Sequence, residues 1–323
     1  MKKTTFLFTL AISLWISIGI TSATVFRVNN GLTENISGRL FTEIKSAHDH
    51  VSVRNGDTLM VEGSGKEYEF FTCTKRLIIM GPGYFLGENN GVNSVVASAK
   101  VSSITFEVES KGSYLIGMEV TFRVSVFANN VYIIRSKANQ LYFNRAAGCK
   151  VAMSHITSIG GFAVGGDISV TNSIIDNDAS GIAYVNYDNN ILIGKTYTWQ
   201  VSAGTFRNNI LIDRDAKVDI KSPNMQNNLA QNGQFGTDNG NRIYETADLF
   251  VGGTSSDGRY RIKANSPYIA AGYNGTQPGI FGGSEPYVLS GTPPIPILYD
   301  LNVPGSGSAA SGLTISVKIR GAN

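Results

Sequence analysis

Short runs of β-branched residues recur along the chain, and an asparagine precedes each run. Asn190, Asn209 and Asn228 are spaced 19 residues apart, and Asn172 lies 18 residues before the first of them. Asn130 lies a further 42 residues upstream, which is two intervals of 21. A period of about 19 to 21 residues is typical of one coil of a parallel β-solenoid, in which each coil adds a short strand to each sheet. The repeat therefore predicts an all-β parallel β-helix.

Such a stack gives the asparagines a structural role. Coils lie about 4.8 Å apart, so an Asn at the same bend of every coil can take the left-handed conformation and bond its amide to the next Asn. Leucine-rich repeats share the period, but their leucine pattern is missing. Strand alternation after each Asn predicts inward-pointing side chains at Val131, Ile133, Ile191, Ile193, Ile210 and Ile212.

The composition excludes several other classes of protein. Of 323 residues, 42% are hydrophobic and 16% are charged, which is too apolar and too weakly charged for a disordered chain. The 27 basic and 24 acidic residues nearly cancel, which argues against a nucleic-acid partner. The 36 Gly and 28 Asn residues are explained by the bends of a solenoid. The low charge leaves few groups for acid–base catalysis.

The N-terminus has the pattern of a secretory signal peptide. Lys2 and Lys3 precede an apolar stretch from Phe6 to Ile20, and the small residues Thr21-Ser22-Ala23 follow. The stretch is short for a membrane span and is interrupted by polar residues. Residues 1–23 are therefore expected to be a signal peptide, and the mature chain to be secreted or held at the cell surface without a transmembrane segment.

The first coils carry a signature of their own. Gly38 to Asp49 is expected to form a helix, with Leu40, Ile44 and Ala47 on one face, that caps the open end of the solenoid. The strand sequences Gly56-Asp57-Thr58-Leu59 and Leu77-Ile78-Ile79-Met80-Gly81-Pro82-Gly83 follow. This order resembles the right-handed parallel β-helix proteins of the pectin-lyase-like group.

The later segments Asn265–Gly272 and Gly279–Gly283 are similar to the closing coil of secreted bacterial β-helix proteins, many of which have no assigned activity. The resemblance spans roughly residues 25 to 290. It implies a right-handed β-helix with an N-terminal cap helix over residues 24–283. This fold hosts lyases, hydrolases, adhesins and binding proteins, so it does not by itself imply an activity.

Residues 284–323 form a tail rich in Pro, Gly and Ser. Leu313 to Ile319 alternates as a strand, and the tail is expected to pack back on the solenoid as a C-terminal cap. An edge strand, a docking segment and a secretion signal are the alternatives. Cys73 and Cys149 lie four coils apart, roughly 19 Å, which is too far for a disulfide. Both are therefore expected to be buried free thiols.

One outer edge of the predicted coils collects charged side chains. The candidates for catalysis are Asp176, Asp213, Asp215, Lys195 and Arg214. A β-helix lyase would use such acids to hold Ca²⁺ around a uronate and a Lys or Arg as base, whereas a hydrolase would use two carboxylates. Asp176 and Asp213 are predicted to lie two coils apart, about 10 Å, which is too far to share one cation and slightly beyond the spacing of an inverting hydrolase. Solvated turn residues are the favoured interpretation.

Two smaller motifs are weaker. Arg261-Ile262-Lys263 resembles a tripeptide of pectin-hydrolysing β-helix enzymes, but the Gly-His-Gly motif of that family is absent. His48 and His50 do not share a helix face, and only His155 remains as a further histidine, so no metal site is expected.

Aromatic residues are densest at Tyr184, Tyr187, Tyr197 and Trp199. If exposed, these rings would stack on sugar faces and form a ligand-binding site, and if buried they belong to the core. The leading hypothesis is a non-catalytic binding or structural protein directed at a polysaccharide or another surface polymer. The alternatives are a polysaccharide lyase or glycoside hydrolase acting on an acidic polysaccharide, and an adhesin tethered by its tail. No cofactor is expected apart from Ca²⁺ in the case of a lyase.

Overall fold

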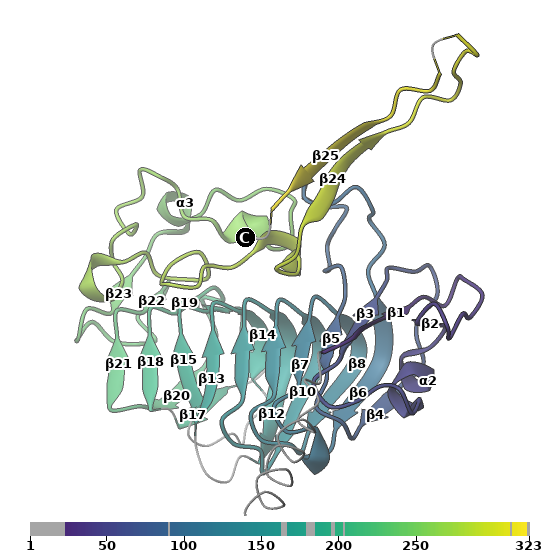
Figure 1. Cartoon of the computed structure of the whole chain (residues 1–323). Coiled ribbons are helices and arrows are strands. Elements are labelled where there is room, and N and C mark those ends of the chain that lie inside the picture. The colour runs from purple at the N-terminus through teal and green to yellow at the C-terminus, as the bar shows by residue number, and fades with distance from the viewer. Residues whose placement is uncertain are drawn as a thin grey trace, which may run out of the picture.

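The protein is a parallel β-helix with a long irregular segment laid along one side and a hairpin that projects from it (Figure 1). The computed structural model describes residues 23–89, 91–162, 167–178, 185–194, 198–202, 204–310 and 312–321. Every neighbouring pair in the two large sheets is parallel, as the repeat predicts. The all-β solenoid is therefore confirmed.

Within the described residues, each of the two large sheets runs the length of the stack. The first has the strand order β2 (Leu40–Phe41), β1 (Val25–Val28), β3 (Thr58–Val61), β5 (Ile78–Met80), β7 (Tyr114–Ile116), β9 (Tyr132–Ile134), β11 (Lys150–Ala152), β13 (Ile168–Thr171), β15 (Val185–Asp188), β18 (Thr205–Arg207) and β21 (Asn224–Gln226). The second has the order β23 (Arg242–Ile243), β22 (Leu229–Ala230), β19 (Ile210–Leu211), β16 (Ile191–Leu192), β14 (Ile174–Asp178), β12 (His155–Phe162), β10 (Lys137–Asn144), β8 (Glu119–Val126), β6 (Lys100–Phe106) and β4 (Phe71–Cys73). A short third sheet pairs β17 (Trp199–Ser202) with β20 (Val218–Lys221).

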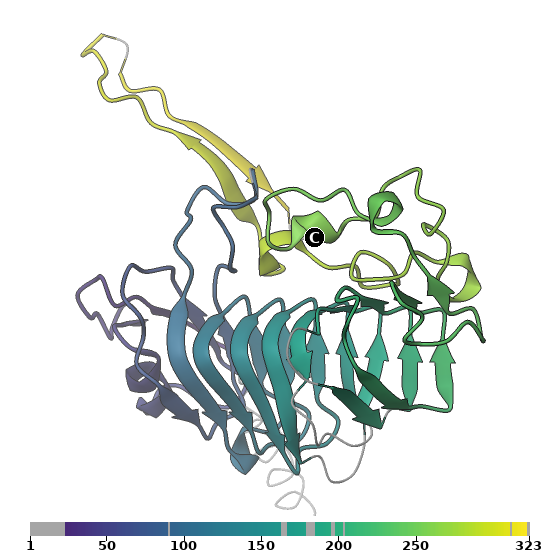
Figure 2. The same cartoon turned by 180° about the vertical axis from the view of Figure 1, so that it is seen from behind.

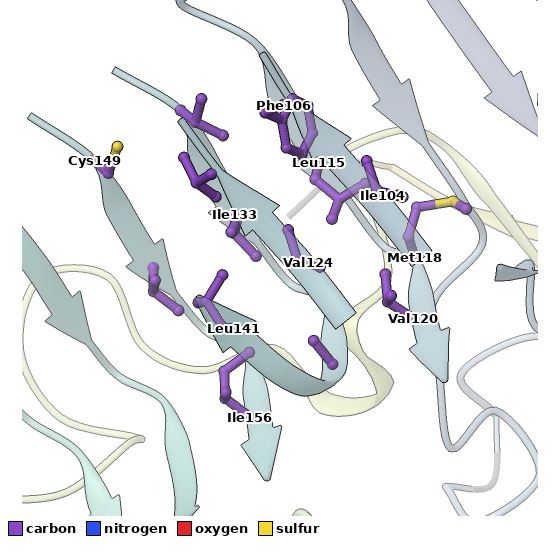
Figure 3. Close-up of a cluster of buried hydrophobic side chains, with 14 of the residues drawn as sticks. Ile104, Phe106, Leu115, Met118, Val120, Val124, Ile133, Leu141, Cys149 and Ile156 are labelled. Carbon is purple, nitrogen blue, oxygen red and sulfur yellow. The ribbon is translucent and has the colours of Figure 1, made fainter. Parts of the chain in front are cut away.

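The core fills the space between the two large sheets. Equivalent positions of successive coils stack in register, as in the row of Leu115, Ile133 and Val151. Leu141 and Val124 do the same in the facing sheet, and all five side chains are at most 1% exposed (Figure 3). Stacked aliphatic rows bury side chains from both sheets at once, and this burial is the main stabilising contribution. The inward orientation predicted for Val131 and Ile133 is confirmed.

The N-terminal helix is shorter than predicted. Helix α2 covers Ile44–Asp49, and its start is fixed by Glu43 and Ser46, which form a capping box. The prediction that the helix begins at Gly38 is wrong, because Leu40–Phe41 pairs with β1 as strand β2. Ile44 and Ala47 are fully buried in the core cluster. The helix lies beside the first strands (Figure 1), and its role as a cap stays a prediction.

Pairs of neighbouring asparagines form the corner between the two large sheets. The second residue of each pair points inward, so that the Asn190 amide donates to Asn209 Oδ1 at 3.0 Å and the Asn209 amide to Asn228 Oδ1 at 3.1 Å. Asn228 continues the row to Asn241 at 3.0 Å. In earlier coils Ser136, Ser154 and Ser173 occupy the same position. The backbone N–H of Ser136 donates to the Ser154 hydroxyl, that of Ser154 donates to the Ser173 hydroxyl, and that of Ser173 donates to Asn190 Oδ1. This buried polar ladder confirms that the asparagines are structural.

The left-handed conformation falls on the residue just before each of the ladder positions Ser173, Asn190, Asn209 and Asn228. Asn172, Asn189, Asn208 and Asn227 have φ between 48° and 61°. The sequence analysis expects one Asn per coil both to adopt the left-handed conformation and to bond the next coil. In the structure the first of two neighbouring residues is left-handed, and the second forms the bond between coils. Asn130 is also left-handed, at φ 56°, but it precedes β9 in the first sheet and is not a member of the ladder.

Residues 244–291, called the covering segment below, run back along the outside of the β-helix (Figures 1 and 2). They contain α3 (Thr246–Leu249) and the 3₁₀ turns η2 (Gly258–Tyr260), η3 (Tyr273–Gly275) and η4 (Leu289–Gly291), and a further 3₁₀ turn, η1 (Val108–Ser110), lies in the solenoid. The predicted boundary at residue 283 falls inside this segment, and the last solenoid strand ends at Ile243.

The left-handed asparagines hold the covering segment coil by coil. Asn227 donates to Ala271 O, Asn208 accepts from Tyr273 N, and Asn189 donates to Gln277 O. Asn172 donates to the carbonyls of Ile280 and Gly282 at 2.9 and 2.7 Å. The segment is therefore attached to one coil after another by the same residue type.

The covering segment also explains a wrong prediction about side-chain direction. Ile191 and Ile210 do not point into the core but belong to a second apolar cluster that includes Ile280, and Ile193 and Ile212 pack against it. Their neighbours Leu192 and Leu211 point inward instead. A Cβ at Gly279 would lie 2.8 Å from Ile210 Cδ1, so only glycine lets the segment approach this closely.

The end of the chain forms an antiparallel hairpin of β24 (Ile297–Asn302) and β25 (Ser316–Arg320), so a terminal strand is present as predicted. The expectation that this tail packs back on the solenoid is wrong for the hairpin, which projects into solvent (Figures 1 and 2). Leu301 and Val317 are 49% and 50% exposed.

Cys73 and Cys149 are buried free thiols, as expected from their separation. In the part of the chain that the structure describes, no helix is long and apolar enough to cross a membrane. The predicted signal peptide lies outside the described residues except for Ala23, and it stays a prediction.

Candidate functional site

A polar groove runs between the first sheet and the covering segment. Its volume is about 320 Å³. One wall is the carboxyl end of β13, β15 and β18, and the other wall is the covering segment. The lining residues are Thr171, Asn172, Asp188, Asn189, Arg207, Asn208, Tyr273, Asn274, Thr276, Gly283, Ser284 and Glu285.

The β-helix wall presents one residue from each of three successive coils. Thr171, Asp188 and Arg207 are the last residues of their strands and lie in register with one another. They face outward because the preceding residues of these strands, Val170, Tyr187 and Phe206, are buried in the core. The groove therefore begins with a row of polar side chains at the spacing of the coils.

An ion pair organises this wall. Arg207 Nε lies 3.2 Å from Asp188 Oδ1, and Arg207 Nη2 lies 3.3 Å from Asp188 Oδ2. The Thr205 hydroxyl donates to Asp188 Oδ2 at 3.2 Å. The hydrogen bond to Asp188 raises the pKa of Arg207. The two side chains therefore hold each other in place and are only partly exposed, which suits them to hydrogen bonding with a ligand.

Tyr273 forms the opposite side of the groove. Its position is set by its backbone N–H, which donates to Asn208 Oδ1 at 2.7 Å. The Arg207 guanidinium carbon lies 5.4 Å from the centre of the Tyr273 ring, within the range of a cation–π contact. The tyrosine is 43% exposed. A fixed aromatic ring beside charged and amide groups is a combination that recognises sugars, because the ring contacts apolar sugar faces and the polar groups bond hydroxyls.

Both carboxylates that line the groove form ion pairs with basic side chains. Asp188 is paired with Arg207, and Glu285 lies 2.5 Å from the Lys150 ammonium. Among the residues that the structure describes, no three His, Cys, Asp or Glu side chains come together in a way that could hold a metal ion. The two carboxylates of the groove therefore hold the side chains of Arg207 and Lys150 in place.

The predicted alignment of Asp176 with Asp213 is wrong. Asp176 is in β14, where Ile174 pairs with Ile191 and Ile175 with Leu192. Extending this register places Asp176 beside Ile193 rather than beside the residues that align with Asp213. The cause is the coil from Asn172 to Asn189, which is shorter than the later coils. Asp176 Oδ1 instead lies 3.0 Å from His155 Nε2.

The remaining catalytic candidates lie in turns. The Asp213 carboxylate accepts the backbone N–H of Asp215 at 2.9 Å, so it stabilises its own turn. Arg214 and Asp215 are exposed, and the Arg214 carbonyl accepts from Gln234. Lys195 lies outside the described residues. Asp213, Arg214 and Asp215 thus share one turn, whereas Asp176 contacts His155 instead.

The predicted aromatic site needs correction at two positions. Tyr187 and Trp199 are each 1% exposed and belong to the core cluster, so neither ring can stack on a ligand at the surface. Tyr184 and Tyr197 lie outside the described residues, and their part in binding stays a prediction.

The groove residues were not predicted, because the candidate residues were sought at the positions that follow each asparagine. The residue just before each Asn-Asn pair is polar in three successive coils, namely Asp188, Arg207 and Gln226. That position is the last outward-facing residue of a strand, so its periodic polarity was an available signal. Nothing in the sequence near Tyr273 indicates that it lies beside Arg207, because the two meet only through the covering segment.

No protein-family model, curated protein or solved structure matched this chain in the comparisons made.

Proposed function

We propose that this protein is a non-catalytic carbohydrate-binding β-helix that is exported and binds a polysaccharide in the groove between β13–β18 and the covering segment. The observation that carries the proposal is the contact of Arg207 with both Asp188 and the ring of Tyr273. It provides a fixed ring and fixed hydrogen-bonding groups side by side. The N-terminal signal pattern and the resemblance to pectin-lyase-like β-helices support export and a surface polymer as ligand.

The open shape of the groove fits a polymer better than a small free metabolite. Its wall presents one polar side chain per coil, namely Thr171, Asp188 and Arg207, so a row of polar groups can meet successive units of an extended chain. Binding by such a row depends on several weak contacts, and removal of one contact weakens binding without abolishing it.

The test is affinity electrophoresis of residues 24–323 through gels that contain neutral or acidic polysaccharides. The variant Tyr273→Ala is expected to lose about fivefold in affinity for the retarding polymer, since a ring contact contributes on the order of 1 kcal/mol. Phe122→Ala is the matched control, because Phe122 is exposed and also lies below an arginine, Arg123, but outside the groove.

Equal retardation of the wild type and Tyr273→Ala by every retarding polymer would refute the groove as the binding site. The same polysaccharides are incubated with the protein with and without Ca²⁺ and analysed for new reducing ends and unsaturated products. Product formation would replace the binding proposal with the lyase or hydrolase alternative.

A further inference from the structure

A second pocket lies where the covering segment meets the base of the hairpin. Its volume is about 220 Å³, and Val92, Arg261, Tyr287, Val288, Leu289 and Arg320 line it. Arg261 belongs to the covering segment, whereas Arg320 is the last residue of β25. Two arginines from distant parts of the sequence therefore line one small pocket.

Each arginine is held in place by a contact that leaves most of its donors available. The Arg261 guanidinium carbon lies 4.6 Å from the centre of the Phe281 ring. Arg320 Nη2 donates to Val92 O at 3.1 Å. A guanidinium has five N–H donors, so one ring contact or one hydrogen bond does not satisfy it.

Among the residues that the structure describes, none that lines the pocket carries a negative charge to offset the two cations. None of its lining residues is an Asp or Glu, and neither arginine forms an ion pair with a described residue. The nearby Asp257 is fully buried and accepts hydrogen bonds from Asn89, Ser255, Ser290 and Tyr287. The rest of the lining includes the apolar side chains of Val92, Val288 and Leu289, so the two arginines supply the charged groups of the pocket.

We propose that this pocket binds an oxyanion group, such as a carboxylate, sulfate or phosphate, between Arg261 and Arg320. The planar fork of a guanidinium matches two oxygens of such a group, and an anion in the pocket can accept charge-assisted hydrogen bonds from both arginines. This inference is independent of the proposed saccharide groove, because the two sites share no lining residue.

An anion in this position connects two parts of the chain. Arg320 is at the base of the projecting hairpin, and Arg261 is in the covering segment that is bound to the β-helix. The occupied site therefore holds the hairpin base against the covering segment, and backbone amides of residues 316–320 exchange more slowly with solvent.

The experiment is isothermal titration of residues 24–323 with sodium sulfate, sodium phosphate and sodium glucuronate at constant ionic strength maintained with NaCl. Saturable binding of at least one anion is expected, and its affinity identifies which oxyanion the pocket prefers. Arg261→Gln and Arg320→Gln are each expected to weaken binding about tenfold or more, because each removes charge-assisted hydrogen bonds.

Arg259→Gln is the matched control, because Arg259 is an exposed neighbour that donates to Ser255 O and does not line the pocket. It should bind the anion as the wild type does. Near-ultraviolet circular dichroism verifies that each variant is folded, and the rise in melting temperature with added anion gives a second readout. Absence of saturable binding in the wild type, or equal weakening by Arg259→Gln, would overturn the proposal.

Discussion

Asn208 and Asn209 are neighbours in the chain whose side-chain amides serve opposite sides of the β-helix wall. Asn208 points outward, and its Oδ1 accepts the backbone N–H of Tyr273 at 2.7 Å. Asn209 points inward, where its amide nitrogen donates to Tyr187 O at 2.9 Å and to Asn228 Oδ1 at 3.1 Å. The first asparagine attaches the covering segment, and the second joins one coil to the next.

Loss of the inward amide is expected to destabilise the stack. Asn209→Ala leaves the backbone N–H of Asn190 and the carbonyl of Tyr187 without this partner in a buried site. The expected loss is about 3 kcal/mol of unfolding free energy, because buried unsatisfied groups cost 1–3 kcal/mol each. Urea denaturation measures it, with the exposed Asn232→Ala as the control. A loss no larger than that of the control would contradict the ladder.

The outward position is expected to favour glycine over alanine. Asn208 has φ 57°, a conformation that alanine adopts at a cost of about 1–2 kcal/mol and that glycine adopts freely. Both Asn208→Gly and Asn208→Ala remove the bond to Tyr273, so the difference between their unfolding free energies isolates the backbone strain. Asn208→Gly should be the more stable by about 1 kcal/mol. The reverse order would show that the left-handed geometry is wrong.

The periodic spacing was sufficient to predict the solenoid, because Asn190, Asn209 and Asn228 recur at one interval and each is followed by a short apolar strand. The strand direction was not predictable in the same way. An Asn-Asn pair does not reveal which member turns inward, and the choice reverses the face of Ile191 and Ile210. Both faces of these strands carry apolar residues, so hydrophobic alternation does not distinguish the inward face from the outward face.

Local sequence patterns could not predict the path of the covering segment or the position of the groove. Asn172 and Gly282 are 110 residues apart in the chain, and no local signal relates them. The groove exists only where these distant parts meet. Asp188 and Arg207 were identifiable as periodic polar positions, whereas the role of Tyr273 depends on long-range packing.

A buried carboxylate holds the far end of the covering segment. Asp257 accepts from Asn89 Nδ2 at 2.9 Å and from Ser290 N at 2.7 Å, so it joins the loop after β5 to the end of the segment. Asp257→Ala is expected to lose about 3 kcal/mol of stability, since several buried donors lose their acceptor. Hydrogen exchange should speed up at residues 84–89 and 287–291. The exposed Asp238→Ala serves as control, and unchanged exchange in Asp257→Ala would refute this role.

His48 is expected to make stability depend on pH. Burial lowers the pKa of His48 below its ordinary value of 6.5, against the opposing effect of the hydrogen bond to Asp49. The neutral ring accepts the backbone N–H of Thr74 at its Nε2 and faces the ammonium of Lys75. Below pH 6.5 the unfolded chain binds more protons than the folded protein. This contribution to stability is therefore present above pH 6.5 and is lost as the pH falls through the folded pKa.

The variant His48→Gln removes the titrating group and can still accept from Thr74. The fall in unfolding free energy between pH 7 and pH 5 should be smaller for this variant than for the wild type. Urea denaturation at the two pH values measures the difference. An identical pH dependence of the two proteins would show that His48 titrates as it does in the unfolded chain.

Neither thiol is expected to react in the folded protein. Burial raises the pKa of Cys73 to about 12 and also raises the pKa of Cys149, so little thiolate forms and reagents have no access. A colorimetric thiol assay should detect no reactive thiol in native protein and both after denaturation in guanidinium. Rapid labelling of a native thiol would indicate that the corresponding coil opens readily.

The path of the covering segment changes how the β-helix should unfold. In a simple solenoid each coil contacts only its neighbours, so the ends can fray one coil at a time. Here the covering segment is bound to the coils of Asn227, Asn208, Asn189 and Asn172 and then to the loop at Tyr84. Fraying at the C-terminal end therefore also strains contacts many coils away. The covering segment is therefore expected to make the coils that it contacts unfold together, as one cooperative unit.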